Sequence, residues 1–467
     1  WFWWWRLRMQ LTKKSARHIA LALTQASTVL LSSHVAHAET TATSNKESTT
    51  SPFSLSKIVE PGWKVDTAVL MYKEADSRVQ AIEPSVRFEK DFGDQHILSG
   101  KVVVDSLTGA SPNGATSANV AQTFTGPSGN AAKPTPANQL PLDDEFHDTR
   151  VAASANWQQP IAPDMKLNVG GNVSNEYDFR SIGANASIAK DFNDKNTTVS
   201  LGGAFEYDSI DAVGGAPVPL TPQLDGQKQQ GTKSKNVSDV LLGLTQVIDR
   251  HSLVQLNYSL SMSNGYQNDP YKILTLVDAN GNLIADLDFA AGNNFYLFEN
   301  RPEKRTRHSF FGEYKYGFDR GDVADVSYRF TTDDWGVKSH TFDAKYRYAV
   351  NEKYFVEPHV RYYTQTAADF YHSYLKVGDG IELDAQGEPI PTVQYASADS
   401  RLGAFDATTY GVKFGMNLAN DRELSFRVEQ YDQKAKDLKP IGGNLAGQIL
   451  QPDLSTTFVQ LGYSFKW

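Results

Sequence analysis

The chain ends with the stretch TTFVQLGYSFKW, residues 456–467, in which apolar and polar side chains alternate up to the last residue. A period of two places alternate side chains on opposite faces of a β-strand. One face of this terminal strand therefore meets an apolar medium, either a protein core or a lipid bilayer. The apolar positions are Trp467, Phe465, Tyr463, Leu461 and Val459.

The composition favours a membrane protein built from strands. Of 467 residues, 40% are hydrophobic, and the mean hydropathy of -0.44 is too polar for membrane-spanning helices. Aromatic residues make up 11% and there are 34 glycines, a mixture that suits strands with a single apolar face. There is no cysteine, which excludes disulfides, thiolate metal sites, thiol nucleophiles and a lipid anchor on cysteine.

The N-terminal region predicts export. A basic segment (9–18), a short apolar segment (19–33) and the pattern Ala36-His37-Ala38 predict a signal peptide over 9–38, cleaved after Ala38. The apolar segment is shorter than the roughly 20 residues that span a bilayer. Removing 1–38, which carries five basic and no acidic residues, takes the net charge from -9 to -14 and argues against a nucleic-acid partner. We interpret 1–8 as a spurious upstream leader, 39–57 as a flexible linker and 58–467 as the folded barrel.

About 16 strand-like segments of roughly 10–14 residues follow, and their connections alternate in length. Seven tight turns rich in Asp and Asn lie at 91–95, 159–164, 192–196, 248–251, 318–322, 350–353 and 419–422. The intervening connections are long, except for short hairpins near Asp76, Tyr177 and Asp334; the long ones lie at 107–145, 211–235, 264–305, 367–404 and 433–454.

Long loops at one end and tight turns at the other predict an all-β fold. It is a transmembrane antiparallel up-and-down β-barrel with long extracellular loops and short periplasmic turns. In this arrangement Trp467 closes the last strand against the first. Aromatic residues near the strand ends are expected to form two interfacial girdles: Trp157, Phe192, Phe318, Tyr354 and Trp467 beside the turns, and Tyr207, Trp335 and Tyr363 toward the loops.

Several stretches resemble one family, the bacterial outer-membrane β-barrels catalogued as domain of unknown function 3570. They are VDSLTGASPNGA (104–115), EYDFRSIGANASIAKDF (176–192), GYQNDPYKI (265–273), ENRPEKRTRHSFF (299–311), DDWGVKSHTFDAKYRY (333–348), EPHVRYYTQTAADFYHS (357–373) and SADSRLGAFDATTYGVKFG (397–415). The resemblance implies a barrel in the outer membrane of a Gram-negative bacterium, in contact with outer-membrane lipid. It also suggests a periplasmic or redox-system partner, although the chain has no cofactor motif and no cofactor is expected.

The polar face of the later strands carries charges of both signs. Each Lys or Arg at the membrane midplane would cost about 2–4 kcal/mol if it faced lipid, so this face must meet water or opposite charges. Two interpretations remain open: a salt-bridged interior that stiffens the barrel, or a solute-lining pore without strong ion selectivity. The predicted pore-lining residues are Glu313, Lys315, Asp325, Arg329, Asp343, Lys345, Arg347, Glu357, Arg361, Lys413, Arg427 and Glu429; Glu423 shares their face.

Two kinds of loop motif are candidate sites. Residues 278–288 resemble a calcium loop, but Gly281 is fourth rather than sixth, so a β-hairpin turning at Asn-Gly is preferred. Residues 382–393 are expected to form a similar hairpin. His147 and His372 lie beside carboxylates in 143–148 and 369–373. We interpret them as solvated loop residues rather than a metal or hydrolytic site, and we predict no catalytic or metal-binding residue.

The sequence therefore predicts a channel, or a membrane platform for an extracytoplasmic system, and not an enzyme. An outer-membrane enzyme with an active site at the rim and a soluble exported β-protein are the alternatives. The terminal strand ending at Trp467 also resembles the signal that barrel assembly machinery recognises.

Overall fold

The computed structural model describes residues 62–75, 78–109, 112–125, 134–141, 147–224, 227–285, 294–436, 442–448, 450–451 and 453–466. The expected leader, signal peptide, linker and Trp467 lie outside the described residues. Among those described, no helix has the length and apolar character needed to cross a membrane.

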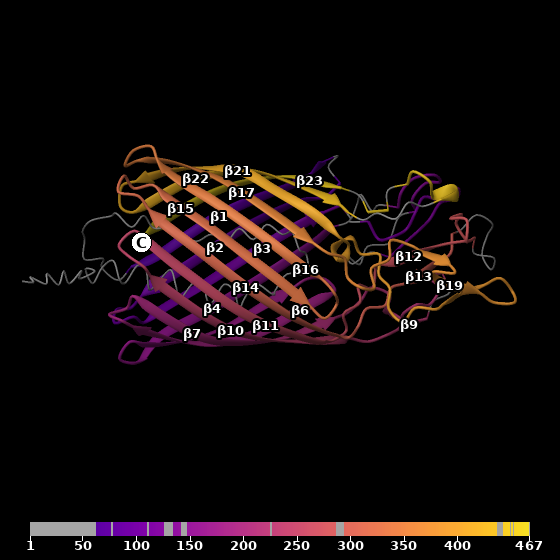
Figure 1. Ribbon diagram of the computed structural model, residues 1–467, viewed down its shortest axis with the longest axis horizontal. Coiled ribbons are helices and arrows are strands. Elements are labelled where there is room, and N and C mark those ends of the chain that lie inside the picture. The colour runs from indigo at the N-terminus through magenta and orange to yellow at the C-terminus, as the bar shows by residue number, and fades with distance from the viewer. Residues whose placement is uncertain are drawn as a thin grey trace, which may run out of the picture.

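Sixteen antiparallel strands close into one barrel, which confirms the predicted fold class (Figure 1). In order around the barrel they are β1 (Trp63–Glu74), β2 (Gln80–Asp91), β3 (Ile97–Thr108), β4 (His147–Ala162), β5 (Met165–Asn175), β6 (Phe179–Phe192), β7 (Thr197–Ile210), β10 (Lys233–Val247), β11 (Ser252–Gly265), β14 (Lys304–Gly317), β15 (Val323–Asp333), β16 (Lys338–Ala349), β17 (Tyr354–Gln365), β21 (Phe405–Leu418), β22 (Arg422–Ala435) and β23 (Leu454–Lys466).

The terminal stretch closes the barrel. β23 pairs with β22 on one side and with β1 on the other, where Phe465 lies opposite Val65 and Leu461 opposite Val69. β23 therefore presents no unpaired edge. β23 ends beside the tight turns, since Lys466 forms an ion pair with Asp421 in the turn between β21 and β22 (2.6 Å).

Alternation along the strands separates an outer from an inner face. Large apolar side chains point outward and are about half exposed, as the lipid-facing band of a membrane barrel requires. The expected girdle residues Phe192, Phe318 and Tyr354 are exposed in this way. The prediction for Trp335 was wrong: it is 4% exposed because it packs with Phe370 inside a loop cluster.

The seven tight turns lie at one end of the barrel, and the long connections gather at the other (Figure 1). Asn and Asp side chains build the turns by accepting backbone hydrogen bonds two or three residues ahead. Asn351 Oδ1 accepts from the N–H groups of Lys353 and Tyr354 (both 2.9 Å), and Asp249 Oδ1 accepts in the same way from His251 and Ser252.

The long connections form a folded unit of their own, here called the loop cap: the described residues of 112–141, 211–232, 266–303 and 366–404. Two loops share one five-stranded sheet, in the order β13-β12-β18-β19-β20. A short two-stranded sheet, β8 (Ala216–Pro217) with β9 (Lys228–Gln229), lies in a third. The five strands are β12 (Ile273–Val277), β13 (Tyr296–Phe298), β18 (Leu375–Val377), β19 (Gly380–Leu383) and β20 (Pro389–Pro391).

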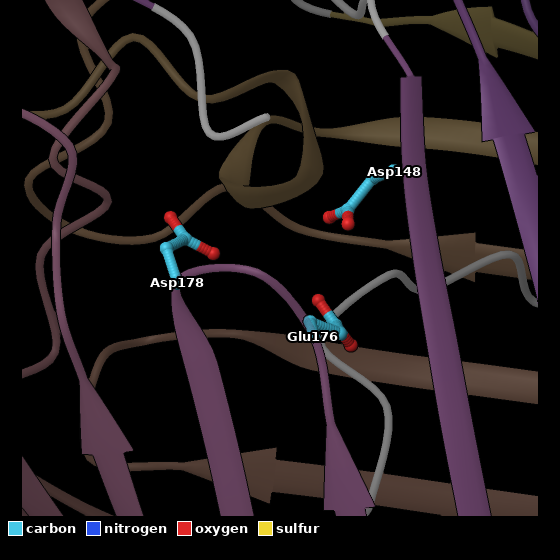
Figure 2. Close-up of side chains that lie close together, drawn as sticks. All are labelled: Asp148, Glu176 and Asp178. Carbon is cyan, nitrogen blue, oxygen red and sulfur yellow. The ribbon is translucent and has the colours of Figure 1, made fainter. Parts of the chain in front are cut away.

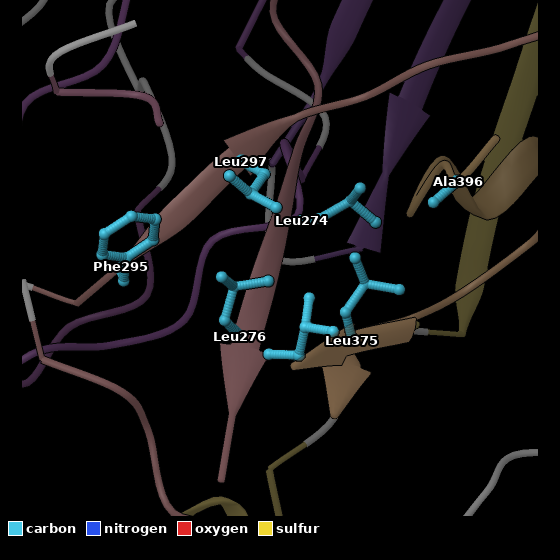
Figure 3. Close-up of a cluster of buried hydrophobic side chains, with 7 residues drawn as sticks. Leu274, Leu276, Phe295, Leu297, Leu375 and Ala396 are labelled. Carbon is cyan, nitrogen blue, oxygen red and sulfur yellow. The ribbon is translucent and has the colours of Figure 1, made fainter. Parts of the chain in front are cut away.

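The loop cap has a buried apolar core (Figure 3). Leu274, Leu276 and Leu375 are fully buried, and they pack together with Leu297 and Ile381. Both predicted loop hairpins are present. In the first, Asp278 Oδ1 accepts from the N–H groups of Asn280 and Asn282; in the second, β19 pairs with β20. Asp286 and Asp288 of the calcium-like motif lie outside the described residues.

Candidate functional site

The predicted pore-lining residues lie on the inner face of the barrel, on β14–β17, β21 and β22. Each alternates with outward-facing apolar residues such as Phe342, Val360 and Phe426, which are exposed. The structure therefore places these charges together inside a closed barrel. That they line a conducting path stays a prediction.

These inner charges pair with one another. Lys315 lies 3.4 Å from Glu313 and 3.3 Å from Asp325. Lys345 lies 3.4 Å from Asp343, and its side chain is 28% exposed. Acidic and basic residues are nearly equal in number on this wall, so their charges nearly cancel. Most of the paired side chains are partly exposed, so the wall is accessible to water.

Glu423 connects strands that are not neighbours. It accepts from Lys413 on β21 (3.2 Å) and lies 3.7 Å from Arg347 on β16, although β17 and β21 separate β16 from β22. Arg427 lies between Glu429 (3.6 Å) and Glu357 (3.9 Å). The inner wall here is a connected network rather than a set of isolated pairs.

Another part of the inner wall, on β5–β7 and β10, is packed more tightly. Lys166 pairs with Asp191 at 3.2 Å and Lys235 with Asp208 at 2.9 Å, and none of the four side chains is more than 5% exposed. Sequence reasoning missed these pairs because small residues dominate the inner face of these strands. The sequence did contain one signal: Asp208 and Lys235 both lie on the inner face of their strands. The register between β7 and β10 places them directly opposite one another.

Near the loop end, the inner face of β1 and β21–β23 is apolar. Tyr72, Phe405, Tyr431 and Phe458 are buried against one another, and Tyr363 packs at their edge. This corrects the assignment of Tyr363 to an outer girdle. The alternation rule distinguishes two faces of a strand, but it does not reveal that part of the inner face is apolar.

Three carboxylates meet at the loop-end rim: Asp148, Glu176 and Asp178 (Figure 2). Their oxygens lie within 4.8 Å of one another. Burial, reinforced by Asp148, raises the pKa of Glu176 to about 7. Burial also raises the pKa of Asp178 to about 6, although Tyr271 donates a hydrogen bond to it (2.5 Å).

Carboxylate oxygens are the ligands that Ca²⁺ prefers, so this trio is the group among the described residues that could hold a metal ion. The expectation of no metal ligand stays a prediction. Neither of the two candidate histidines belongs to the trio: His147 is exposed at the start of β4, and His372 is half-buried in the loop cap.

A second charged group lies in the loop cap, and its Glu299, Arg301 and Asp399 side chains are buried. Arg301 contacts Glu299 (2.7 Å) and Asp399 (2.9 Å), and Arg401 joins Asp399 to Asp269 (3.1 Å). Burial raises the pKa of Glu299 to about 7. Burial would also raise the pKa of Asp399, but Arg401, Lys272 and Arg301 hold it well below its usual value.

The stretches that carry the family resemblance converge on this rim. Lys272 Nζ, from 265–273, donates to the carbonyl of Pro112 in 104–115 (2.6 Å). Tyr271 from the same stretch donates to Asp178, and Arg301 reaches Asp399 in 397–415. Residues far apart in sequence thus fasten the loop cap to the barrel mouth.

A closed antiparallel barrel with an apolar outer band and a charged interior defines the class of outer-membrane-type β-barrels. Within that class, the chain matches, over residues 20–465, the model of a family described as "Protein of unknown function (DUF3570)", and it belongs to that family. This confirms the resemblance found in the sequence. No curated protein matches the chain.

Solved structures with a similar barrel are distant. The ferric enterobactin receptor PfeA of Pseudomonas aeruginosa, in complex with enterobactin, is 11% identical with a TM-score of 0.39; the match covers 82% of this chain and 56% of that one. The siderophore receptor PirA of Acinetobacter baumannii is 8% identical (TM-score 0.38, covering 88% and 60%). A bacterial polysaccharide outer membrane secretin is 10% identical (TM-score 0.40, covering 88% and 99%). The chain thus spans little more than half the length of the first receptor.

Proposed function

We propose that this protein is an outer-membrane channel for small polar solutes, and that its conduit runs along the charged inner wall of β14–β17, β21 and β22. The observation that carries the proposal is the partial exposure of paired charges inside a closed barrel, such as Lys345 at 28% and Glu423 at 25%. Charges in this state need water beside them, because neither lipid nor a dry core tolerates them.

The sign pattern suggests what the channel would pass. Lysine and arginine side chains alternate with carboxylates within a few ångströms, as at Lys315 with Asp325 and Lys413 with Glu423. The field of each charge is largely cancelled by its neighbour, so the wall attracts neither ion sign strongly. Weak ion selectivity is the expected behaviour.

Reconstitution into planar bilayers tests the proposal. Folded protein, identified by heat-modifiable migration on gels, is expected to give stepwise conductance with a reversal potential close to zero in a salt gradient. The proposal fails if folded, inserted barrels give no steps.

A second candidate, a membrane platform for a partner, is favoured by the loop cap. Loops that only connect strands do not need a buried core such as Leu274, Leu276 and Leu375. An ordered surface of this kind suits binding of an extracytoplasmic partner. If folded barrels gave no conductance, the platform function would be favoured over the channel function.

We propose export through a cleaved signal peptide to the outer membrane of a Gram-negative bacterium, contact with its lipid, and insertion by assembly machinery that recognises the strand ending at Trp467. A periplasmic or redox-system partner stays a prediction of the family resemblance alone. No enzymatic activity, cofactor or nucleic-acid partner is proposed.

A further inference from the structure

One histidine inside the barrel is held by two carboxylates. His359 lies on β17, and its Nε2 is 2.9 Å from Asp343 Oδ2 on β16. Its Nδ1 is 2.9 Å from Glu429 Oε1 on β22. The imidazole ring therefore links three strands of the inner wall through both of its nitrogen atoms.

A glycine makes the link to Glu429 possible, because that link crosses the intervening strand β21. β21 lies between β17 and β22, and in register His359 pairs with Gly411, which in turn pairs with Glu429. A Cβ on residue 411 would lie 2.4 Å from the Val428 carbonyl oxygen and 2.5 Å from Glu429 Cγ. The missing side chain leaves the space across which His359 and Glu429 meet.

The number of protons on the ring decides whether both links hold. A neutral imidazole has one N–H and one lone pair, so it can donate to only one carboxylate. The imidazolium ion has two N–H groups and can donate to both, in charge-assisted hydrogen bonds. On loss of the proton, one ring nitrogen would turn its lone pair toward a carboxylate oxygen, and that link would break.

The neighbouring charges determine how the inner wall responds to deprotonation of the ring. The charged groups facing His359 are Asp343 and Lys345 on β16, Glu357 and Arg361 on β17, Lys413 on β21, and Arg427 and Glu429 on β22. Lys345 and Arg427 already contact the two carboxylates, at 3.4 and 3.6 Å. Deprotonation of His359 thus removes one positive charge from the wall and frees the ring from one strand, while both carboxylates keep a cationic neighbour.

We propose that His359 is a proton-operated cross-link of the inner wall, so that the ion selectivity of the barrel changes with pH over the range in which imidazole titrates. The proposal rests on the channel function proposed above. Protonated His359 makes the wall more positive and joins β16, β17 and β22. Neutral His359 leaves the wall more negative and the three strands less firmly joined, so the conduit favours cations more at pH 8 than at pH 5.

Reversal potentials measured across a KCl gradient at pH 5 and pH 8 test this inference. One unit charge a few ångströms from the ion path, screened by water and salt, predicts a rise in the ratio of K⁺ to Cl⁻ permeability of roughly twofold to fivefold at pH 8. His359→Gln should abolish this rise. Gly411→Ala should keep most of it, because the histidine still gains and loses its charge after the added methyl group breaks its link to Glu429.

His308→Gln is the matched control. His308 lies on the outer face of β14, where its ring is hydrogen-bonded to the Tyr258 hydroxyl (2.9 Å). Its substitution should therefore leave the pH dependence unchanged. An unchanged pH dependence in His359→Gln would overturn the inference. Failure of the channel function would instead appear as a lack of steps at both pH values.

A second measurement tests the cross-link without conductance. In barrels labelled with ¹⁵N-histidine and held in detergent micelles at pH 6, the ring signal absent from His359→Gln should report two protonated nitrogens. In Gly411→Ala that signal should move toward the values of a free imidazole. A neutral ring at pH 6 in the native barrel would overturn the cross-link itself.

Discussion

Truncation of one leucine should destabilise the loop cap and leave the barrel intact. Leu276 is fully buried in β12, which lies between β13 and β18 in the cap's sheet. Paired strands on both sides prevent the surroundings from collapsing into the space that Leu276→Ala would leave. Leucine-to-alanine changes at such sites cost about 3–5 kcal/mol.

This cost can be read as a rate of proteolysis. Each 1.4 kcal/mol is a factor of ten in an equilibrium constant, so the open state of the cap should become about 100-fold to 4,000-fold more populated. Cleavage of a transiently opened region depends on that population when opening and closing are fast. The assay is protease digestion of the folded protein in detergent, with fragments monitored on gels.

Leu383→Ala is the matched control, because Leu383 belongs to the same sheet but is 46% exposed. Surface changes of this kind usually shift stability by no more than about 0.5 kcal/mol, so cleavage should stay close to the native rate. Heat-modifiable migration should be unchanged in both variants. If Leu276→Ala were cleaved no faster than Leu383→Ala, the cap would not be held by this core.

Three further outcomes are expected. In intact cells, Gln386→Cys in the loop cap should react with an impermeant thiol reagent and Lys353→Cys in a tight turn should not. Reversed labelling would mean that the tight turns, and not the loop cap, face the cell exterior. The pKa of Glu176 is raised to about 7, so its contribution to stability is present at low pH and lost as pH rises from about 4.5 through 7. Glu176→Gln should therefore raise the unfolding temperature more at pH 8 than at pH 5. An equal rise at the two pH values would show that the pKa of Glu176 is not raised in the folded protein. Trp467→Asp should sharply reduce the heat-modifiable species if the terminal strand guides assembly, whereas Lys466→Gln should not.

The sequence predicted the barrel well where large residues mark both faces. On β16, Phe342 and Tyr346 face outward while Asp343 and Lys345 face inward, so the period of two is unmistakable. Tight turns built on Asp and Asn then fixed the strand count and the end at which the loops gather. These are local signals, which a single sequence carries in full.

Nonlocal features could not be predicted in this way. Asp148 and Glu176 approach one another only because β4 and β5 pair in a particular register. Arg301 and Asp399 meet only because two long loops fold together. No spacing in the sequence encodes such contacts, so the rim carboxylates and the buried charges of the cap emerged only from the structure.

The inner wall illustrates the same limit within a strand. His359 lies on the polar face of β17, as the alternation of that strand predicts, but its bridge to Glu429 depends on Gly411, which is 52 positions further along the sequence. In the same way, Phe458 occupies one of the pattern's polar positions yet packs in an apolar cluster. A strand's pattern identifies its two faces, and the partners across the barrel decide what each face does.

The most direct test of the account is cysteine modification during single-channel recording, for which the cysteine-free chain is well suited. Lys345 and Ala344 are adjacent on β16 and point to opposite faces, inward and outward. A bulky thiol reagent should reduce the conductance of Lys345→Cys in discrete steps and leave Ala344→Cys unchanged. If both variants responded alike, or if neither responded although both were shown to be labelled, the charged inner wall would not line the conducting path.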